Sequence, residues 1–503
     1  MTWRRKERQA REQQTPQTVA PPHADSVSEV ERLRRENERL RKQVVDQARE
    51  IEDLKRQLAL RQQNSTITSK PPSSDGLAGL QRVRGRRVKS RRKPGGQPGH
   101  PGHHRPLVPV ERVDAIVDLA PDTCRHCAHR LHARDDVGAP RRHQVTELPP
   151  LTAHVTEYRC HRRQCRACGQ MTLAALPEDR GGQFGPQLTA LIAYLTVVCR
   201  LPRLVVQRFL DGALHMPISL GSTQNAWEEA SAAVAAPYAE LQAALPHELV
   251  LNVDETGHRT NGDKRWLWTF VARTFVIYRI VASRGSDVLK TVLGDTFAGV
   301  LGSDRLPTYL KYVVGQRQFC WAHVTRNLLS ALDLAQTPAA KRFCREALAL
   351  DRRLFRLWHR FRGDPRARGV PLTRAQLMDK VLPIEKRLFA LGERHLDAHN
   401  KDVRNLATAF FVHNQHFFTF VHAAGVEPTN NAAERALRTA VQWRKIMFGT
   451  RSDDGERAVE RLLTVTRTCQ LQQISALAFL TAAIAAHRRH QKVASLLRKA
   501  QTR

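Results

Sequence analysis

Three β-rich runs joined by short turns begin at Glu248, and they constrain the fold of this chain more than any other feature. The runs are ELVLNVDE (Glu248 to Glu255), KRWLWTFVA (Lys264 to Ala272) and FVIYRIVAS (Phe275 to Ser283). Short apolar runs rich in β-branched and aromatic residues, bounded by turn residues, are typical of strands. We therefore expect three consecutive antiparallel strands.

The segments that follow predict two more strands and then a long helical stretch. A helix is expected over Asp287 to Leu293, a fourth strand at GVLGSD (Gly299 to Asp304) and a fifth at RQFCWAH (Arg317 to His323). The spacing of apolar residues then changes to a helical one over Val324 to Phe420, in another helix around Glu434, and over Val459 to Arg498. This order predicts an α/β core that a helical insertion interrupts.

Three acidic residues stand at points where such a core could bring them together. Asp254 and Asp304 end strand-like runs, and Glu434 lies one turn into a helix. Mg²⁺ prefers carboxylate oxygens, and two such ions can activate the attacking oxygen and stabilise the leaving oxygen in phosphoryl transfer. The pattern therefore favours a metal-dependent enzyme that cuts DNA.

Each acid also has an ordinary structural interpretation. Asp254 and Asp304 could be turn residues at strand ends. Asn431 and Glu434 have capping-box spacing, so the glutamate could serve only the start of its helix. The nearby Glu255 and Glu427 are treated as bystanders, because Glu255 should point to the strand face opposite Asp254.

The charge balance indicates a polyanionic partner. The 503 residues include 81 Lys and Arg against 48 Asp and Glu, with a pI near 10.8. Such a surplus attracts nucleic acid, although a merely soluble cationic surface is the alternative. The N-terminus has no apolar signal region, and no window reaches the roughly 20 apolar residues of a membrane span, so a cytoplasmic, nucleoid-associated protein without a membrane partner is expected.

A heptad pattern runs from Val30 to Leu58 and predicts a coiled coil over residues 26–63. Apolar residues occupy most a and d positions, and Asn37 occupies one a position. Leu at d with a single Asn at a favours a parallel dimer. The alternative is one amphipathic helix that packs on its own body.

Residues 64–105 read as a linker arm that is rich in Pro, Gly and basic residues. Eight of the twelve residues from Arg82 to Lys93 are Arg or Lys, and PGGQPGH follows. Cations without base-reading side chains give affinity for phosphates rather than sequence choice. The candidate DNA contacts in this arm are Arg86, Arg87, Arg91, Arg92 and Lys93.

Two CxxC pairs predict a zinc ribbon over residues 106–175, with His143 to Arg159 as a strand-like stretch between them. Four thiolates suit a structural zinc ion, and a domain this small needs such a metal. The predicted ligands are Cys124, Cys127, Cys165 and Cys168, with His126, His129, Cys160 and His161 close enough to leave the ligand set open.

Residues 180–245 are predicted to be helical, with helices at Leu188 to Arg200, Leu204 to Leu214 and Ser219 to Ala235. A helix-turn-helix is one interpretation of this region. Ordinary packing before the core is the other, because no set of base-reading residues stands out.

Several motifs closely resemble the transposases of the insertion sequence 66 family. They are KPGGQPGH, the two CxxC pairs, DETGHRTNG, WLWTF, GVLGSD, RQFCWAHVTRNL, and NNAAERALR with WRKIMFGTRS. The resemblance covers roughly residues 60–485. It implies a ribonuclease-H-like core of the DDE type, with Asp254, Asp304 and Glu434 as catalytic residues that bind two Mg²⁺ or Mn²⁺ ions.

The resemblance also points to a Cys-x-x-His signature, here Cys320 and His323, whose role it leaves open. Two positions depart from the family pattern. Arg305 stands where the family usually has Gly, and Thr429 stands where an Asp is common. These changes put the loop shape and the DNA contacts in doubt, whereas the three acids are intact.

Together these features predict a multidomain protein: coiled coil, basic arm, zinc ribbon, mainly helical region, an α/β catalytic core over 246–455 with an insertion at about 324–420, and a helical region over 456–503. The resemblance implies cleavage of element ends and joining of the free 3′-hydroxyl to double-stranded target DNA. Further candidate phosphate contacts are Arg435, Arg438, Arg444 and Lys445. A homodimer or larger synaptic complex and accessory proteins are the expected partners, and an inactive DNA-binding regulator is the alternative.

Overall fold

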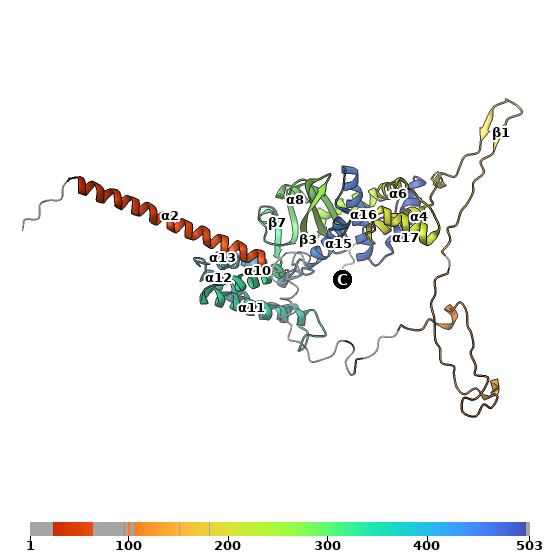
Figure 1. Ribbon diagram of the computed structural model, residues 1–503, viewed down its shortest axis with the longest axis horizontal. Coiled ribbons are helices and arrows are strands. Elements are labelled where there is room, and N and C mark those ends of the chain that lie inside the picture. Colours follow the sequence, from red (N-terminus) through yellow and green to blue (C-terminus); the bar gives the residue numbers. More distant parts are fainter. Residues whose placement is uncertain are drawn as a thin grey trace, which may run out of the picture.

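The computed structural model describes residues 24–63, 95, 99–100, 105–149, 151–180 and 182–498. Figure 1 shows a helix-covered sheet, a long helix that projects from one side, and an extended arm on the other. Most of the basic linker, including Arg86, Arg87, Arg91, Arg92 and Lys93, lies outside the described residues. Among the described helices, none is long and apolar enough to cross a bilayer.

The centre of the molecule is a five-stranded sheet with the order β5-β4-β3-β6-β7. The antiparallel strands are β3 (Val250–Thr260), β4 (Asp263–Val271) and β5 (Val276–Val281). Asn261 and Gly262, both with positive φ, form the two-residue turn between β3 and β4, as Asn-Gly pairs do in hairpins. The three expected antiparallel strands are confirmed, and β3 runs five residues further than predicted.

The two remaining strands run parallel to β3, and each is reached through a helix. Helix α8 (Ser286–Leu293) leads to β6 (Thr296–Ser303), and α9 (Pro307–Leu310) leads to β7 (Val313–Phe319). The predicted fifth strand was wrong in its second half, because α10 (Trp321–Leu334) begins directly after Cys320. The backbone N–H of Trp321 donates to Pro428 O (3.0 Å), a contact that local sequence does not reveal.

Helices α15 (Asn431–Met447) and α16 (Asp453–Leu471) pack against the antiparallel half of the sheet. Side chains of α16 accept hydrogen bonds from the backbone of the edge strand β5: Thr464 Oγ1 from Tyr278 N (3.0 Å) and Thr468 Oγ1 from Val276 N (3.2 Å). These bonds satisfy the free edge of the sheet. The edge next to β5 is therefore closed by a helix.

The helical region predicted before the sheet is confirmed, with a fourth helix that was not expected separately. Its helices are α4 (Pro186–Val197), α5 (Arg203–Leu214), α6 (Leu220–Ala233) and α7 (Ala235–Ala244). Helices α4, α6 and α7 share a hydrophobic core with the sheet, whereas α5 packs in a separate cluster against α4 and α6. The last helix, α17 (Ala476–Arg488), packs on α4 and α6, and Arg488 at its end is paired with Glu229 (2.6 Å). The helix predicted to continue to Arg498 was too long, because α17 ends at Arg488.

A second hydrophobic core lies in the insertion between β7 and α15. It consists mainly of α10, α11 (Pro338–Phe361), α12 (Arg374–Glu393), α13 (Lys401–Val412) and α14 (Thr419–His422). Gly392 lets α12 approach α13 closely, since a Cβ there would lie 2.7 Å from Ala407 O. The long helical stretch predicted from the sequence is confirmed as this insertion.

The heptad segment forms one straight helix, α2 (Ala24–Gln62), whose C-terminal end docks on the insertion. Arg56 Nε donates to Asp402 Oδ2 (3.0 Å), and Gln63 and Ser330 exchange hydrogen bonds. The apolar a and d side chains, by contrast, are about half exposed, for example Leu40 at 46% and Leu54 at 56%. The heptad segment is therefore helical, whereas its pairing with the same helix of a second copy stays a prediction.

The predicted ribbon region forms an extended arm with short local elements. Each CxxC pair makes a tight turn, with Cys124 N bonded to His129 O (2.8 Å) and Cys165 N to Gln170 O (2.8 Å). Two short strands, β1 (Arg162–Gln164) and β2 (Met171–Leu173), flank the second turn. The strand expected over His143 to Arg159 was wrong: its described part is irregular, and Val145 and Val155 are more than 80% exposed, so no neighbouring strand covers them.

Candidate active site

Two of the three predicted acids come from adjacent parallel strands: Asp304 directly follows β6, whereas Asp254 lies within β3 and does not end it as expected. Asn252 on β3 pairs with Gly302 on β6, and each of these residues lies two positions before an acid. The same register carried two residues further sets Asp254 opposite Asp304. Parallel pairing thus brings together two residues that are 50 positions apart in sequence.

Helix α15 brings the third acid to the same edge. Asn430, directly before the helix, is buried, and its Nδ2 donates to Val253 O (2.8 Å), next to Asp254. Glu434 lies in the first turn that follows. The capping-box interpretation of Glu434 was wrong, because Asn430 rather than Asn431 precedes the helix and makes no side-chain cap.

The electrostatics of the two aspartates show that the acids interact. Burial raises the pKa of Asp254 well above its ordinary value, and the nearby Glu255, Asp304 and Glu434 raise this pKa further. Burial also raises the pKa of Asp304, against a backbone hydrogen bond from Leu306 that lowers it. Buried carboxyls that repel one another favour either protons or added cations. The donor set therefore fits hard divalent cations.

The two bystander acids are engaged elsewhere. Glu255 is buried, accepts hydrogen bonds from Arg284 Nε (2.9 Å) and from the Tyr309 hydroxyl, and is ion-paired with Arg284. Glu427 is ion-paired with Arg362 at the surface. Glu255 therefore acts as a structural anchor beneath the site, whereas Asp254 has no such partner among the contacts described here except the N–H of Glu255.

Sequence reasoning missed Arg326, a residue that contacts Glu434 directly. Arg326 donates to Glu434 Oε1 (2.8 Å), and His323 Nδ1 lies 3.6 Å from the same oxygen. Both side chains come from α10, one and two turns after Cys320. Burial and the charge of Arg326 lower the pKa of His323 to about 4. The only available signal was the three-residue spacing of Cys320, His323 and Arg326 at the start of a helix.

The predicted phosphate contacts on α15 are divided between surface and interior. Arg435, Arg438 and Lys445 are exposed, whereas Arg444 is half-buried and lies 3.4 Å from Thr256 Oγ1 on β3. Three of the four therefore face solvent. Arg444 instead connects the helix to the strand that carries Asp254.

Trp443 on the same helix belongs to the core. Its ring is buried and stacks on Trp227 of α6, with ring centroids 6.3 Å apart. Trp443 is therefore a packing residue, and its buried ring cannot stack on a DNA base.

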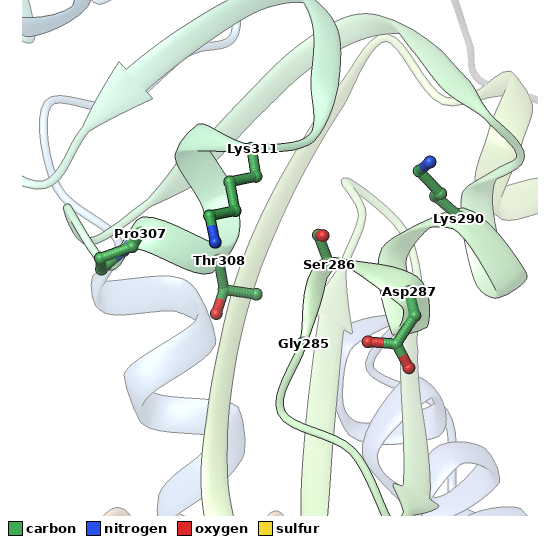
Figure 2. A pocket seen from close by; sticks show the side chains of 7 residues that line it. All are labelled: Gly285, Ser286, Asp287, Lys290, Pro307, Thr308 and Lys311. Atoms are coloured by element: carbon green, nitrogen blue, oxygen red, sulfur yellow. The ribbon is translucent and has the colours of Figure 1, made fainter.

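A surface pocket of about 340 Å³ lies near the acids but does not contain them. Figure 2 shows the start of α8 and the short helix α9 facing each other across it. Its lining residues are Gly285, Ser286, Asp287, Lys290, Pro307, Thr308 and Lys311. Thr308 Oγ1 donates to Arg284 O (3.1 Å), so the pocket adjoins the residue that anchors Glu255. The acids themselves stand outside it.

The structure does not bring the four predicted zinc ligands together. Figure 1 shows the segment near residues 110–140 and the β1 hairpin far apart along the arm. In the described parts of the chain, one group of three or more side chains could hold a metal ion, and it consists of Cys320, His323 and Glu434. A zinc ion held by Cys124, Cys127, Cys165 and Cys168 stays a prediction.

Comparison with known proteins adds two family matches. A family model described as "Transposase IS66 family" matches residues 181–458, which is more than half of the chain. A second model, of a family of unknown function, matches residues 19–106. No curated protein matches the chain.

Proposed function

The chain belongs to the IS66 family of transposases, and from this premise we propose that it is a DDE transposase that cuts the ends of its element and joins them to target DNA. The observation that carries the proposal is the placement of the acids. The register of β3 and β6 sets Asp254 opposite Asp304, and Asn430 ties the helix of Glu434 to β3.

The sheet supports a ribonuclease-H-like core. Three antiparallel strands are followed by two strands parallel to the first, in the order β5-β4-β3-β6-β7. The first acid lies on β3, the second follows β6, and the third lies on a helix that packs against β3. This is the order of elements that the proposed fold requires.

The three carboxylates would hold two Mg²⁺ or Mn²⁺ ions. When bound, these ions lower the pKa of a water molecule and neutralise charge on the phosphate. Within the chain, Asp254 and Asp304 would supply rigid ligands, because Asp254 lies within the paired strand β3 and Asp304 directly follows β6. Glu434 would complete the set, with Arg326 as a competitor for its Oε1. The repulsion that raises the pKa of Asp254 is relieved by divalent cations.

Exposed cations next to the acids would hold the DNA. Arg435 and Arg438 lie one residue and one turn after Glu434 on α15, on the solvent side. The net charge of +33 extends this attraction over the whole protein. The basic arm would add phosphate contacts, and a zinc ion at the CxxC pairs would fold the region between the arm and the core.

The two ends of an element must be cut in concert, so we propose that the transposase acts as a dimer or larger assembly. The half-exposed seam of α2 would supply one contact between copies. Because α2 is anchored on the insertion, pairing of two helices would also position two catalytic cores.

The test is cleavage and joining of labelled double-stranded DNA that carries the flanks of the gene, with Mg²⁺ or with EDTA. Asp254→Ala and Asp304→Ala should abolish both products by more than about a hundredfold, since each removes a metal ligand. The matched control is Asp379→Ala, an exposed acid on α12, which should cut normally.

DNA binding measured on the same samples separates the possible failures. Binding that persists in both variants while joined products disappear is the expected result. Binding by the wild type without metal-dependent cutting on any flank substrate would instead favour a regulator. Loss of binding and of folding in Asp254→Ala would make the acid structural.

A further inference from the structure

Three side chains of different chemistry converge beside the proposed catalytic acids. The ligand atoms of Cys320, His323 and Glu434 all lie within 4.8 Å of one another. Cys320 precedes α10, His323 lies in its first turn, and Glu434 comes from α15. The first helix of the insertion and the helix that follows the insertion therefore meet at this cluster.

The geometry around each atom suits a metal ion. His323 Nδ1 is buried, has no hydrogen-bond partner, and faces Glu434 Oε1 at 3.6 Å. The backbone N–H of Asn430 points at Cys320 Sγ (3.1 Å), and such a donor stabilises negative charge on sulfur. Ligands at about 2.0 to 2.3 Å from a tetrahedral zinc ion are separated by roughly 3 to 4 Å. The 3.6 Å between His323 and Glu434 falls in this range, and all three ligand atoms lie within 4.8 Å, so an ion needs only a small inward shift.

We propose that Cys320, His323 and Glu434 form a zinc-binding site that is separate from the CxxC pairs and shares Glu434 with the proposed magnesium site. A thiolate with an imidazole and a carboxylate selects zinc-like ions over Mg²⁺, which prefers oxygen ligands alone. Three protein ligands leave the fourth position of the ion to water. Binding displaces the thiol proton of Cys320 to solvent, so affinity rises with pH.

Arg326 competes with the ion for the glutamate. Its guanidinium donates to Glu434 Oε1 (2.8 Å), and its Nε is buried without a partner. Zinc therefore has to draw the carboxylate away from Arg326 or share it. Arg326→Gln removes the competing cation and should tighten zinc binding.

The consequence for activity rests on the proposed function. A carboxylate that is held by zinc together with Cys320 and His323 is not available to the metal pair at Asp254 and Asp304. Zinc should therefore inhibit magnesium-dependent cutting by wild-type protein. For each protein, cutting with zinc is divided by cutting without zinc. Zinc should reduce this ratio less in Cys320→Ser than in the wild type.

The direct test is titration of the full-length protein with Co²⁺, which gives a thiolate charge-transfer band and visible bands when it replaces zinc in a tetrahedral site. The background variant carries Ser at the four CxxC cysteines and at Cys160, which removes every thiolate proposed for the ribbon zinc. One equivalent of Co²⁺ should bind with a charge-transfer band. Adding Cys320→Ser should abolish the band, and adding His323→Ala should weaken binding by more than about tenfold.

The matched control is Cys344→Ser in the same background. Cys344 is also buried, but it lies within the core of the insertion. This variant should keep the full charge-transfer band, and circular dichroism verifies that each variant is folded.

A folded background protein without the band, or a band that survives Cys320→Ser, would overturn the proposal. The titration needs no DNA and no cutting. An absence of cutting with Mg²⁺ would therefore count against the proposed function alone, while the Co²⁺ result still decides the zinc site.

Discussion

Asn430 Nδ2 donates a 2.8 Å hydrogen bond to Val253 O, and this bond joins the helix of the third acid to the strand of the first. Asn430 is also buried, and its backbone N–H points at Cys320 Sγ. One residue thus links α15 to β3 through its side chain and to the start of α10 through its backbone. The position of Glu434 depends on it.

Asn430→Ala should reduce cutting far more than it reduces stability. Loss of a buried hydrogen bond costs about 1–3 kcal/mol of unfolding free energy, whereas a misplaced Glu434 would disrupt the proposed metal pair. Asn414→Ala is the matched control, because Asn414 Nδ2 donates to Phe410 O (3.1 Å) within the insertion. Denaturant unfolding and DNA cleavage are measured on both. Equal losses of cleavage in the two variants would contradict the positioning role.

Arg326→Gln should lower the Mg²⁺ concentration needed for half-maximal cutting. The guanidinium competes with cations for Glu434, and an ion pair that is about one quarter exposed on both sides is worth up to about 1 kcal/mol, or roughly a fivefold change. A Mg²⁺ titration of cleavage measures this shift. Arg394→Gln, which breaks an ion pair with Glu346 in the insertion, should leave the titration unchanged. A higher Mg²⁺ requirement in Arg326→Gln would show that Arg326 assists the site.

The raised pKa of Asp254 predicts a stability that depends on pH and on metal. Between about pH 4 and the raised pKa, the folded chain keeps a proton that the unfolded chain has lost, so stability falls as pH rises. In EDTA the contribution of Asp254, measured as the difference in melting temperature between wild type and Asp254→Asn, should therefore fall toward pH 8, and Mg²⁺ should restore it by binding the carboxylates.

Asp254→Asn should remove much of this pH dependence and abolish the response to Mg²⁺. Asp351→Asn is the control, because burial raises the pKa of Asp351 to about 6 at a position within the insertion. That variant should lose part of the pH dependence and keep the Mg²⁺ response. Melting curves at pH 5 and pH 8, with and without Mg²⁺, decide between these outcomes.

Arg435→Gln with Arg438→Gln should weaken DNA binding without sequence preference. Each lost phosphate contact lowers the slope of log affinity against log salt by about 0.9, so the double variant should lose roughly two units. Binding isotherms at several salt concentrations measure the slope. Lys380→Gln with Lys386→Gln, on the exposed face of α12, should leave the slope unchanged.

Leu40→Ala with Leu54→Ala should convert an assembled transposase into a monomer at micromolar concentration. Both are d positions of the half-exposed seam of α2, and truncation of a buried Leu costs about 2–5 kcal/mol. Arg35→Ala with Lys42→Ala, on the outer face of the same helix, should leave the mass unchanged. Sedimentation velocity measures the mass of the two double variants and of the wild type. A wild-type monomer would refute dimerisation through α2.

Local sequence predicted the strands because their signals are local. The β-rich runs and the Asn261-Gly262 turn specify a hairpin without help from distant residues. The end of β7 was misjudged because Trp321 starts a helix whose first N–H bonds to Pro428, more than 100 residues away. The strand predicted over His143 to Arg159 failed for the opposite reason, since no neighbouring strand pairs with its described part.

The candidate site shows the same contrast between local signals and tertiary contacts. The acids were predicted because they occur in motifs, although only Asp304 stands at the end of a strand and Asp254 lies within β3. Arg326 was missed because its role depends on α10 and α15 meeting across the insertion, which a spacing pattern cannot reveal. The engagement of Glu255 with Arg284 and Tyr309 was likewise set by tertiary contacts.

The insertion also imposes an order in time during protein synthesis. Glu434 lies 130 residues after Asp304. A ribosome adds about 5–20 residues per second, so Glu434 emerges roughly 7 to 26 seconds after Asp304. Until then, the nascent chain carries two of the three acids. A product that terminates prematurely within α10 to α14 never acquires the third.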